Sequence, residues 1–131
     1  MVTGDHHTTA KAIAEQIGLI DEKPANQSNW EIVKGEDIPK LTQQDWDRLG
    51  ARTSIVFSRT TPEQKLLIVE EMQKRKQVIA MTGDGVNDSP ALKKADIGVG
   101  MGSGKAKHKM SHLTYNILLR LNLSNKITKL L

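Results

Sequence analysis

The segment from Met81 to Asp96 constrains this chain more than any other, because it joins a short apolar run to a glycine-broken loop with two carboxylates. Asp84 and Asp88 stand four residues apart on this loop, and glycines flank the first of them. Glycine adopts unusual backbone angles and lets the chain approach a ligand closely. Ser89-Pro90 then has the pattern of a helix start. In an open α/β sheet, phosphates and cations bind after a strand and before a helix.

Magnesium is the cation that this loop predicts. Mg²⁺ prefers carboxylate oxygens, water and phosphate oxygens as its ligands. We therefore expect Asp84 to bind the metal, with Asp88 as a further ligand or as support for the first. Asn87 can donate an amide hydrogen bond to a phosphate oxygen. The competing interpretation is a tight turn with Asp88 as a cap, but the position of the whole string between a strand and a helix favours the site.

Two other patterns carry groups that bind phosphate. In Thr3-Gly4-Asp5, a hydroxyl and a glycine amide at the end of a strand can hold phosphate oxygens. Lys65 falls in the first turn of a helix that Thr61-Pro62-Glu63-Gln64 predicts through a capping box, and an ammonium there can neutralise a phosphate. Taken alone, Lys65 would be a surface lysine. His6-His7 suggests a metal site, but we expect the adjacent side chains to point apart, and no third ligand has suitable spacing.

Short apolar runs alternate with helical patterns along the first hundred residues. Strands are predicted at residues 1–2, 31–34, 54–57, 78–81 and 97–99, and helices at 10–17, 42–49, 61–76 and from 89 onward. The third helix should turn Leu66, Val69 and Met72 inward. Residues 21–29 are polar and predict a loop. Strands that alternate with helices indicate an α/β fold with a parallel sheet covered on both faces.

The composition excludes several classes of site. The 131 residues are enough for one domain or part of one. There is no cysteine, so disulfides, thiolate metal sites and a cysteine nucleophile are excluded, and a reducing cytosolic setting is expected. No apolar run approaches the ~18 residues that a membrane span requires. A secretory signal is not predicted either, since no basic leader precedes an apolar stretch.

The chain changes character after Gly102. Residues 105–131 hold six basic residues and no acidic residue, whereas the first 104 residues hold thirteen basic and fifteen acidic residues. Apolar residues of this tail fit both a helical face and a strand-like alternation, and we expect a helix within residues 113–131. A basic anchor for anionic lipid or nucleic acid is the weaker interpretation, because neither a clean amphipathic face nor aromatic interleaving supports it.

Together, Thr3-Gly4-Asp5, the segment Val56–Lys65 and the segment Thr82–Asp96 resemble the phosphorylation domain of P-type cation-transporting ATPases, within the haloacid-dehalogenase-like superfamily. The segment Ser89–Val99 resembles in particular the α subunits that exchange sodium or protons for potassium. The resemblance extends from residue 1 to about residue 102. It implies a partial phosphorylation domain at residues 1–102, followed by a divergent basic tail, helical or disordered, at residues 103–131.

The resemblance implies a role for each candidate residue. Asp84 would hold Mg²⁺ with support from Asp88, and Asp5 would position its loop or gate dephosphorylation. Arg59 would lie near the nucleotide, at the boundary with a separate ATP-binding domain. The phosphate would be contacted by Asn87, Thr3, Gly4 and Lys65. In the parent pump, ATP phosphorylates an aspartate within Asp-Lys-Thr-Gly-Thr, and its hydrolysis drives ion transport. The parent would reside in the plasma membrane with this domain in the cytosol, and a β subunit would be a partner.

The chain departs from the family at the nucleophile. No aspartate is followed by lysine, and the only Asp-x-Asp, Asp45-Trp46-Asp47, falls on a predicted helix, so we discard it. The family's transmembrane helices, actuator domain and nucleotide domain have no counterpart, and the tail lacks the family's acidic helix and Asp-Asp loop. In the family, the phosphorylated aspartate ends a central strand between the strand before Thr3 and the strand 78–81. We therefore expect an incomplete Rossmann-like sheet of marginal stability.

The leading hypothesis is a fragment of an ATP-driven monovalent cation pump. It would provide the Mg²⁺- and phosphate-binding half of the aspartyl-phosphate site and would not turn over ATP alone. A small phosphatase of the same superfamily is one alternative, but it would need a nucleophilic aspartate on a strand. The other alternative is a non-catalytic binding or regulatory module that acts through the basic tail.

Overall fold

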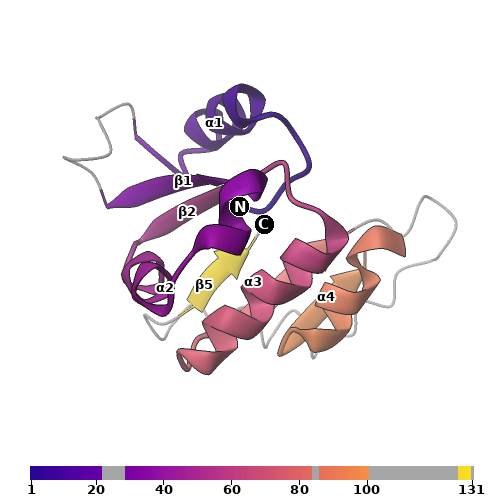
Figure 1. Ribbon diagram of the computed structural model, residues 1–131. Coiled ribbons are helices and arrows are strands. Elements are labelled where there is room, and N and C mark those ends of the chain that lie inside the picture. Colours follow the sequence, from indigo (N-terminus) through magenta and orange to yellow (C-terminus); the bar gives the residue numbers. More distant parts are fainter. Residues whose placement is uncertain (22–28, 84–85, 101–126, 131) are drawn as a thin grey trace, which may run out of the picture.

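The computed structural model describes residues 1–21, 29–83, 86–100 and 127–130. Helices and strands alternate along the chain, as the sequence predicts (Figure 1). Their bounds are α1 (His7–Gln16), β1 (Trp30–Lys34), η2 (Gly35–Lys40), α2 (Gln43–Gly50), β2 (Ser54–Ser58), α3 (Pro62–Lys74), β3 (Val78–Gly83), η3 (Val86–Asp88), α4 (Ser89–Lys94), β4 (Ile97–Gly100) and β5 (Ile127–Leu130). The predicted α/β class is confirmed.

All strand pairs in the described residues are parallel. β1 pairs with β2 along its whole length, from Trp30 opposite Ser54 to Lys34 opposite Ser58. The strand expected at the first two residues is a single parallel bridge between Val2 and Phe57. A second sheet has the order β4-β3-β5. Because the strands are parallel, their carboxyl ends lie at the same edge of each sheet, where an α/β fold places its ligands.

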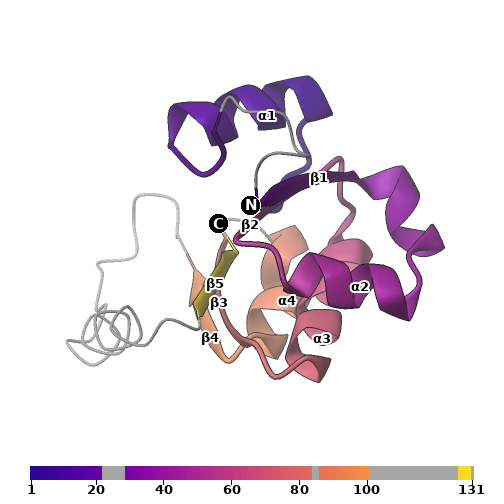
Figure 2. The ribbon, with the colours of Figure 1, turned by 90° about the vertical axis from the view of Figure 1, so that its left-hand side faces the viewer.

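Helices cover both faces of the β1–β2 sheet (Figure 2). On one face, Ala10 and Ala14 of α1 pack with Val56. On the other, Ile55 and Phe57 face α2 and α3, since alternate residues of a strand point to opposite faces. α1 ends as the sequence predicts, with Gly18 at a φ of 70°.

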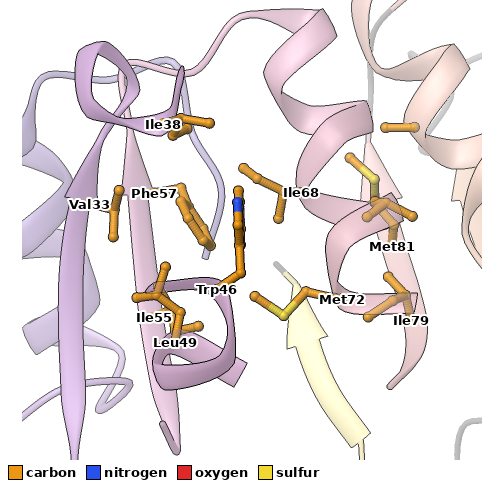
Figure 3. Close-up of a cluster of buried hydrophobic side chains, with 12 residues drawn as sticks. Val33, Ile38, Trp46, Leu49, Ile55, Phe57, Ile68, Met72, Ile79 and Met81 are labelled. Atoms are coloured by element: carbon orange, nitrogen blue, oxygen red, sulfur yellow. The ribbon is translucent and has the colours of Figure 1, made fainter. Parts of the chain in front are cut away.

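The larger hydrophobic cluster joins both sheets through α3 (Figure 3). Phe57 of β2 and Ile79 of β3 are both fully buried in it. The ring of Trp46, on α2, lies 6.1 Å from that of Phe57 between ring centroids. Val69 and Met72 of α3 face inward as predicted, but Leu66 is only half-buried. Ile68 is fully buried instead. Successive residues of a helix are turned by 100°, and the strands that α3 covers determine which of its faces is buried.

Capping boxes start α2 and α3. Thr61 Oγ1 accepts from the Gln64 amide at 3.3 Å, and Gln64 Oε1 accepts from the Thr61 amide at 3.0 Å, with Pro62 at the first turn. Thr42 and Asp45 form the same arrangement at α2. Both helix starts were predicted. α3 ends at Lys74, two residues before the predicted end.

An arginine at the end of α3 ties this helix to α2. Arg75 Nε lies 2.8 Å from Asp47 Oδ1, and Arg75 Nη2 donates to the backbone oxygen of Gln43 at 3.0 Å. Arg75 Nη1 also pairs with the buried carboxylate of Glu71 at 2.8 Å. The ion pairs with Lys74 and Arg75, in that order, lower the pKa of Glu71. The network therefore holds α2 and α3 together at their surface.

Residues 127–130 form a strand, so the helix expected for the tail is wrong for these four residues. Ile127-Thr128 carries β-branched side chains, which favour strands. β5 pairs with the edge of β3 that faces away from β4. The expected loss of a neighbour on that edge of β3 is thus not found, because an open strand edge offers unpaired amides and carbonyls to any extended segment. The rest of the tail, and most of the loop predicted at 21–29, lie outside the described residues.

Across the described ranges, no helix combines the length and the apolar character needed to cross a membrane.

Candidate functional site

Lys65 and Asp88 form an ion pair, although 23 residues separate them. Lys65 Nζ lies 2.6 Å from Asp88 Oδ1. Lys65 stands in the first turn of α3, and Asp88 ends η3, just before α4. The side chains of Lys65 and Asp88 are only 17% and 13% exposed, so the pair is largely shielded from water. The sequence predicts both residues for one site, and the structure brings them together.

The end of β3 packs directly against Asp88. A Cβ added to Gly83 would lie 2.7 Å from Asp88 Oδ2 and 2.8 Å from Asp88 Cβ, closer than real Cβ contacts allow. Only glycine fits there. The absence of a side chain at Gly83 thus lets the strand end pack against the carboxylate of Asp88, while its predicted approach to a phosphate stays a prediction. The strand end, the acid and the lysine form one compact group.

The remaining acidic residue of the predicted site, Asp84, lies outside the described residues, as does Gly85. Asn87 is exposed in η3, next to Asp88. Among the described residues, no group of three or more histidines, cysteines or carboxylates is arranged to hold a metal. The metal and phosphate roles of these residues thus remain predictions.

Thr3-Gly4-Asp5 is a closed turn. Thr3 Oγ1 donates to Asp5 Oδ2 at 2.9 Å, and the Asp5 amide donates to Thr3 Oγ1 at 3.1 Å. The backbone oxygen of Thr3 accepts from the amide and the hydroxyl of Thr60, at 3.1 Å and 3.0 Å. The backbone oxygen of Asp5 accepts from the Arg59 amide at 2.9 Å. The turn is therefore fixed to the connection that leads from β2 into α3, the helix that carries Lys65.

Sequence reasoning missed Thr60 as part of this arrangement. Its hydroxyl binds the Thr3 backbone from 57 positions away, and the residue is buried at 8% exposure. A polar residue two positions after a buried strand was the available signal. The position of its partner depends on the pairing of Val2 with β2, which only the fold supplies.

Arg59 has an unusual backbone for a residue other than glycine, with a φ of 52°. Its carbonyl crowds Gly35, where an added Cβ would lie 2.0 Å from the Arg59 oxygen. Arg59 lines a cavity of about 460 Å³ at the carboxyl end of β1 and β2. The other lining residues are His6, His7, Lys34, Glu36 and Ser58. Basic groups outnumber the single carboxylate of Glu36 around this cavity, which suits an anionic ligand.

The two histidines do not point apart as expected. Their ring centroids lie 4.2 Å from each other, with an angle of 44° between the rings. The reason is local: His6 is the N-cap of α1, with Nδ1 accepting from the Thr8 amide, and His7 begins the helix. Desolvation, followed by the positive charges of His6, Lys34 and Arg59, lowers the pKa of His7.

Asp45 and Asp47 both lie on α2, as the sequence predicts. The carboxylate of Asp45 accepts from the Thr42 amide at 2.9 Å, and hydrogen bonds from Thr42 lower its pKa. Asp47 pairs with Arg75. Both acids are engaged in structural contacts at the surface of a helix, so discarding them as nucleophile candidates agrees with the structure.

The comparisons with known proteins agree with one another. Residues 1–96 match the family described as haloacid dehalogenase-like hydrolase. The sodium/potassium-transporting ATPase subunit alpha of Tetronarce californica is 50% identical over 121 residues, covering 78% of this chain. The subunits alpha-2 of Bos taurus and Homo sapiens are 48% identical with the same coverage. This chain spans 12% of the length of each of these relatives.

Proposed function

Because the chain belongs to the haloacid dehalogenase-like hydrolase family, we propose that it provides the Mg²⁺- and phosphate-binding half of a phosphoryl-transfer site. The similarity to the relatives named above extends this proposal to a cation pump that works through an aspartyl phosphate. The carrying observation is the shielded pair of Lys65 and Asp88 at the end of β3. Burying two charges is costly unless they are paired, so a pair at this edge suits a site that binds ions.

The donor chemistry around Asp88 fits Mg²⁺. One carboxylate oxygen holds Lys65, and the other lies beside Gly83 at the strand end. A hard cation takes carboxylate oxygens and completes its shell with water and phosphate. We assign Asp84 as the metal ligand and Asp88 as its support. When bound, the metal would neutralise negative charge on the transferring phosphoryl group.

Lys65 would help to bind the phosphate by exchanging its contact with Asp88 for one with the phosphate. Its ammonium balances Asp88 in the described state. A phosphate bound beside this pair would offer the same ammonium a second anion. Lys65 would then donate hydrogen bonds to the phosphate, where a fixed ammonium stabilises developing negative charge.

The remaining predicted residues would frame the phosphate. Thr3, Gly4 and Asp5 form the turn that Thr60 fixes to the start of α3. Asp5 engages the Thr3 hydroxyl, which supports a positioning role for this carboxylate. Asn87 is exposed and free to reach a phosphate oxygen. We assign Arg59 to the nucleotide phosphates, and its position on the basic cavity supports this.

At the level of the whole pump, we propose ATP as substrate and monovalent cations as cargo. The plasma membrane would be the location of that pump, with this domain on the cytosolic side and a β subunit as partner. The chain itself would not hydrolyse ATP, because its sequence contains no Asp-Lys pair to supply the nucleophile.

Calorimetric titration of the full chain with Mg²⁺, with and without inorganic phosphate, tests the site. Phosphate should tighten Mg²⁺ binding. Asp84→Asn and Asp88→Asn should weaken Mg²⁺ binding by at least about tenfold, or ~1.4 kcal/mol. Lys65→Met should remove the effect of phosphate. The matched control is the exposed pair of Lys40 and Asp37, 2.9 Å apart, whose variants Lys40→Met and Asp37→Asn should change neither binding constant.

The same preparations separate the alternatives. Equal binding by the Asp84 and Lys40 variants would contradict the site. Hydrolysis of p-nitrophenyl phosphate by the full chain, lost in Asp84→Asn, would instead favour the small phosphatase. Absence of both binding and hydrolysis would leave the non-catalytic module as the better account.

A further inference from the structure

In the described residues, β3 lies between two strands, β4 and β5. β4 follows it closely in sequence, from Ala80 opposite Ile97 to Gly83 opposite Gly100. The other edge is paired with a segment from far along the chain, from Val78 opposite Ile127 to Met81 opposite Leu130. In Figure 2, β5 lies on the side of β3 that faces β2.

We propose that the pairing of Ile127–Leu130 with β3 is what orders the candidate site, so that this distant segment acts as a structural support for it. In this role β5 completes the sheet and holds the carboxyl end of β3 in place. The segment would thereby order the group formed by Gly83, Asp88 and Lys65.

The edge of β3 opposite β4 requires a pairing strand. Without β5, the second sheet would be a pair of short strands, and two-stranded sheets are marginal in water. Ile79 and Met81 are buried at 0% and 6% exposure, so the backbone of β3 runs through the interior. A buried amide or carbonyl without a partner costs about 1–3 kcal/mol. Unpaired amides and carbonyls along this edge of β3 would therefore be costly, and a pairing strand removes that cost.

The sequence and register of residues 127–130 suit this edge of β3. Ile127-Thr128-Lys129-Leu130 begins with two β-branched residues and contains neither glycine nor proline. Its register covers four successive residues of β3 and stops two residues before Gly83. It therefore supports β3 up to Met81, two residues before the strand end that packs on Asp88. This arrangement makes the order of the site depend on a segment distant in sequence.

Hydrogen exchange of the full chain, read on peptides that cover residues 78–83, tests the proposal. Thr128→Pro removes an amide from β5 and should speed exchange of β3 by at least about tenfold. Thr128→Val keeps the amide and the strand preference, so it should leave exchange unchanged. Deletion of residues 127–131 should act like the proline. The β1–β2 pair provides an internal reference, and its exchange should change less than that of β3.

A synthetic peptide of residues 125–131 keeps the test decisive if the truncated chain loses protection everywhere. Added to that chain, the peptide should restore protection of β3, and the same peptide with proline at position 128 should not. Unchanged exchange of β3 after truncation would overturn the proposal, as would failure of the peptide to restore it. Strand exchange between chains, seen as a dimer that dissociates when residues 127–131 are deleted, would overturn the assignment to the same chain.

Discussion

The two sheets of this molecule differ in how they are completed. β1 and β2 pair over five residues, are close in sequence, and have helices on both faces. β3 lies between β4 and β5, and β5 comes from far along the chain. The first sheet is built from neighbouring segments, and the stretch of chain from β1 to β2 supplies six of the twelve buried residues of the larger cluster. The second carries the acids of the candidate site. Stability and chemistry are therefore concentrated in different halves.

α3 connects these halves. Its start carries Lys65, which reaches Asp88 beside the second sheet, and its middle buries Ile68 and Met72 against both sheets. The capping box at Thr61 begins this helix just after β2. A change in the first sheet should thus reach the site through α3, whereas a change in β5 should act on β3 first.

The largest expected effect comes from the centre of the first sheet. Phe57→Ala removes a fully buried ring beside Trp46 and should cost about 3–5 kcal/mol of unfolding free energy. That is comparable to the total stability of a small domain, about 5–15 kcal/mol. Urea unfolding followed by tryptophan fluorescence measures it. Ile17→Ala, at a side chain 53% exposed, is the control and should stay within about 0.5 kcal/mol. A cost of less than about 1 kcal/mol for Phe57→Ala would show that this sheet is not the stable half.

A smaller effect is expected where α2 meets α3. Arg75→Ala removes contacts to Asp47 and Gln43 and leaves the buried carboxylate of Glu71 with Lys74 alone. Breaking a buried pair costs about 3–5 kcal/mol, and the remaining lysine reduces this to about 2 kcal/mol. The same urea titration measures it, with Lys40→Ala as the exposed control. Equal stability of the two variants would mean that the helices are held by their apolar faces alone.

The smallest effect is expected at the start of β3, and it depends on pH. Asp96 Oδ2 accepts from the Ile79 amide at 2.8 Å and from Gln73 at 3.1 Å; these bonds, the first most strongly, lower the pKa of Asp96. A carboxyl whose pKa is lower in the folded state stabilises the fold above its unfolded pKa. This contribution is lost as the pH falls through the folded pKa.

Asp96→Asn should therefore cost about 0.5–1 kcal/mol at pH 7, because the carboxylate is exposed and its bonds are only partly shielded. The difference from the native chain should shrink below pH 4. Urea midpoints measured across this pH range check it. A difference that is constant with pH would show that the charge of Asp96 does not matter.

Local signals predicted much of the fold. Thr61-Pro62-Glu63-Gln64 specified the start of α3 because a capping box involves four neighbouring residues. The apolar runs identified β2 and β3, and Ser89-Pro90 identified α4. Lys65 and Asp88 could be assigned to one site because parallel strands end at a common edge, which places the following helix starts together.

The features that were missed depend on contacts distant in sequence. β5 forms because β3 presents an open edge, and the apolar spacing of the tail fits a helix as well as a strand. Thr60 binds the Thr3 backbone only after Val2 has joined β2. The close approach of the rings of His6 and His7 follows from the way α1 begins, which residue spacing does not reveal.

A crystal structure of the full chain with Mg²⁺ and inorganic phosphate tests the central claim most directly. The account predicts Mg²⁺ on Asp84 with Asp88 beside it as support, and a phosphate oxygen within hydrogen-bond distance of Lys65 Nζ. A phosphate bound elsewhere, with Asp84 directed away from Lys65 and Asp88, would contradict it.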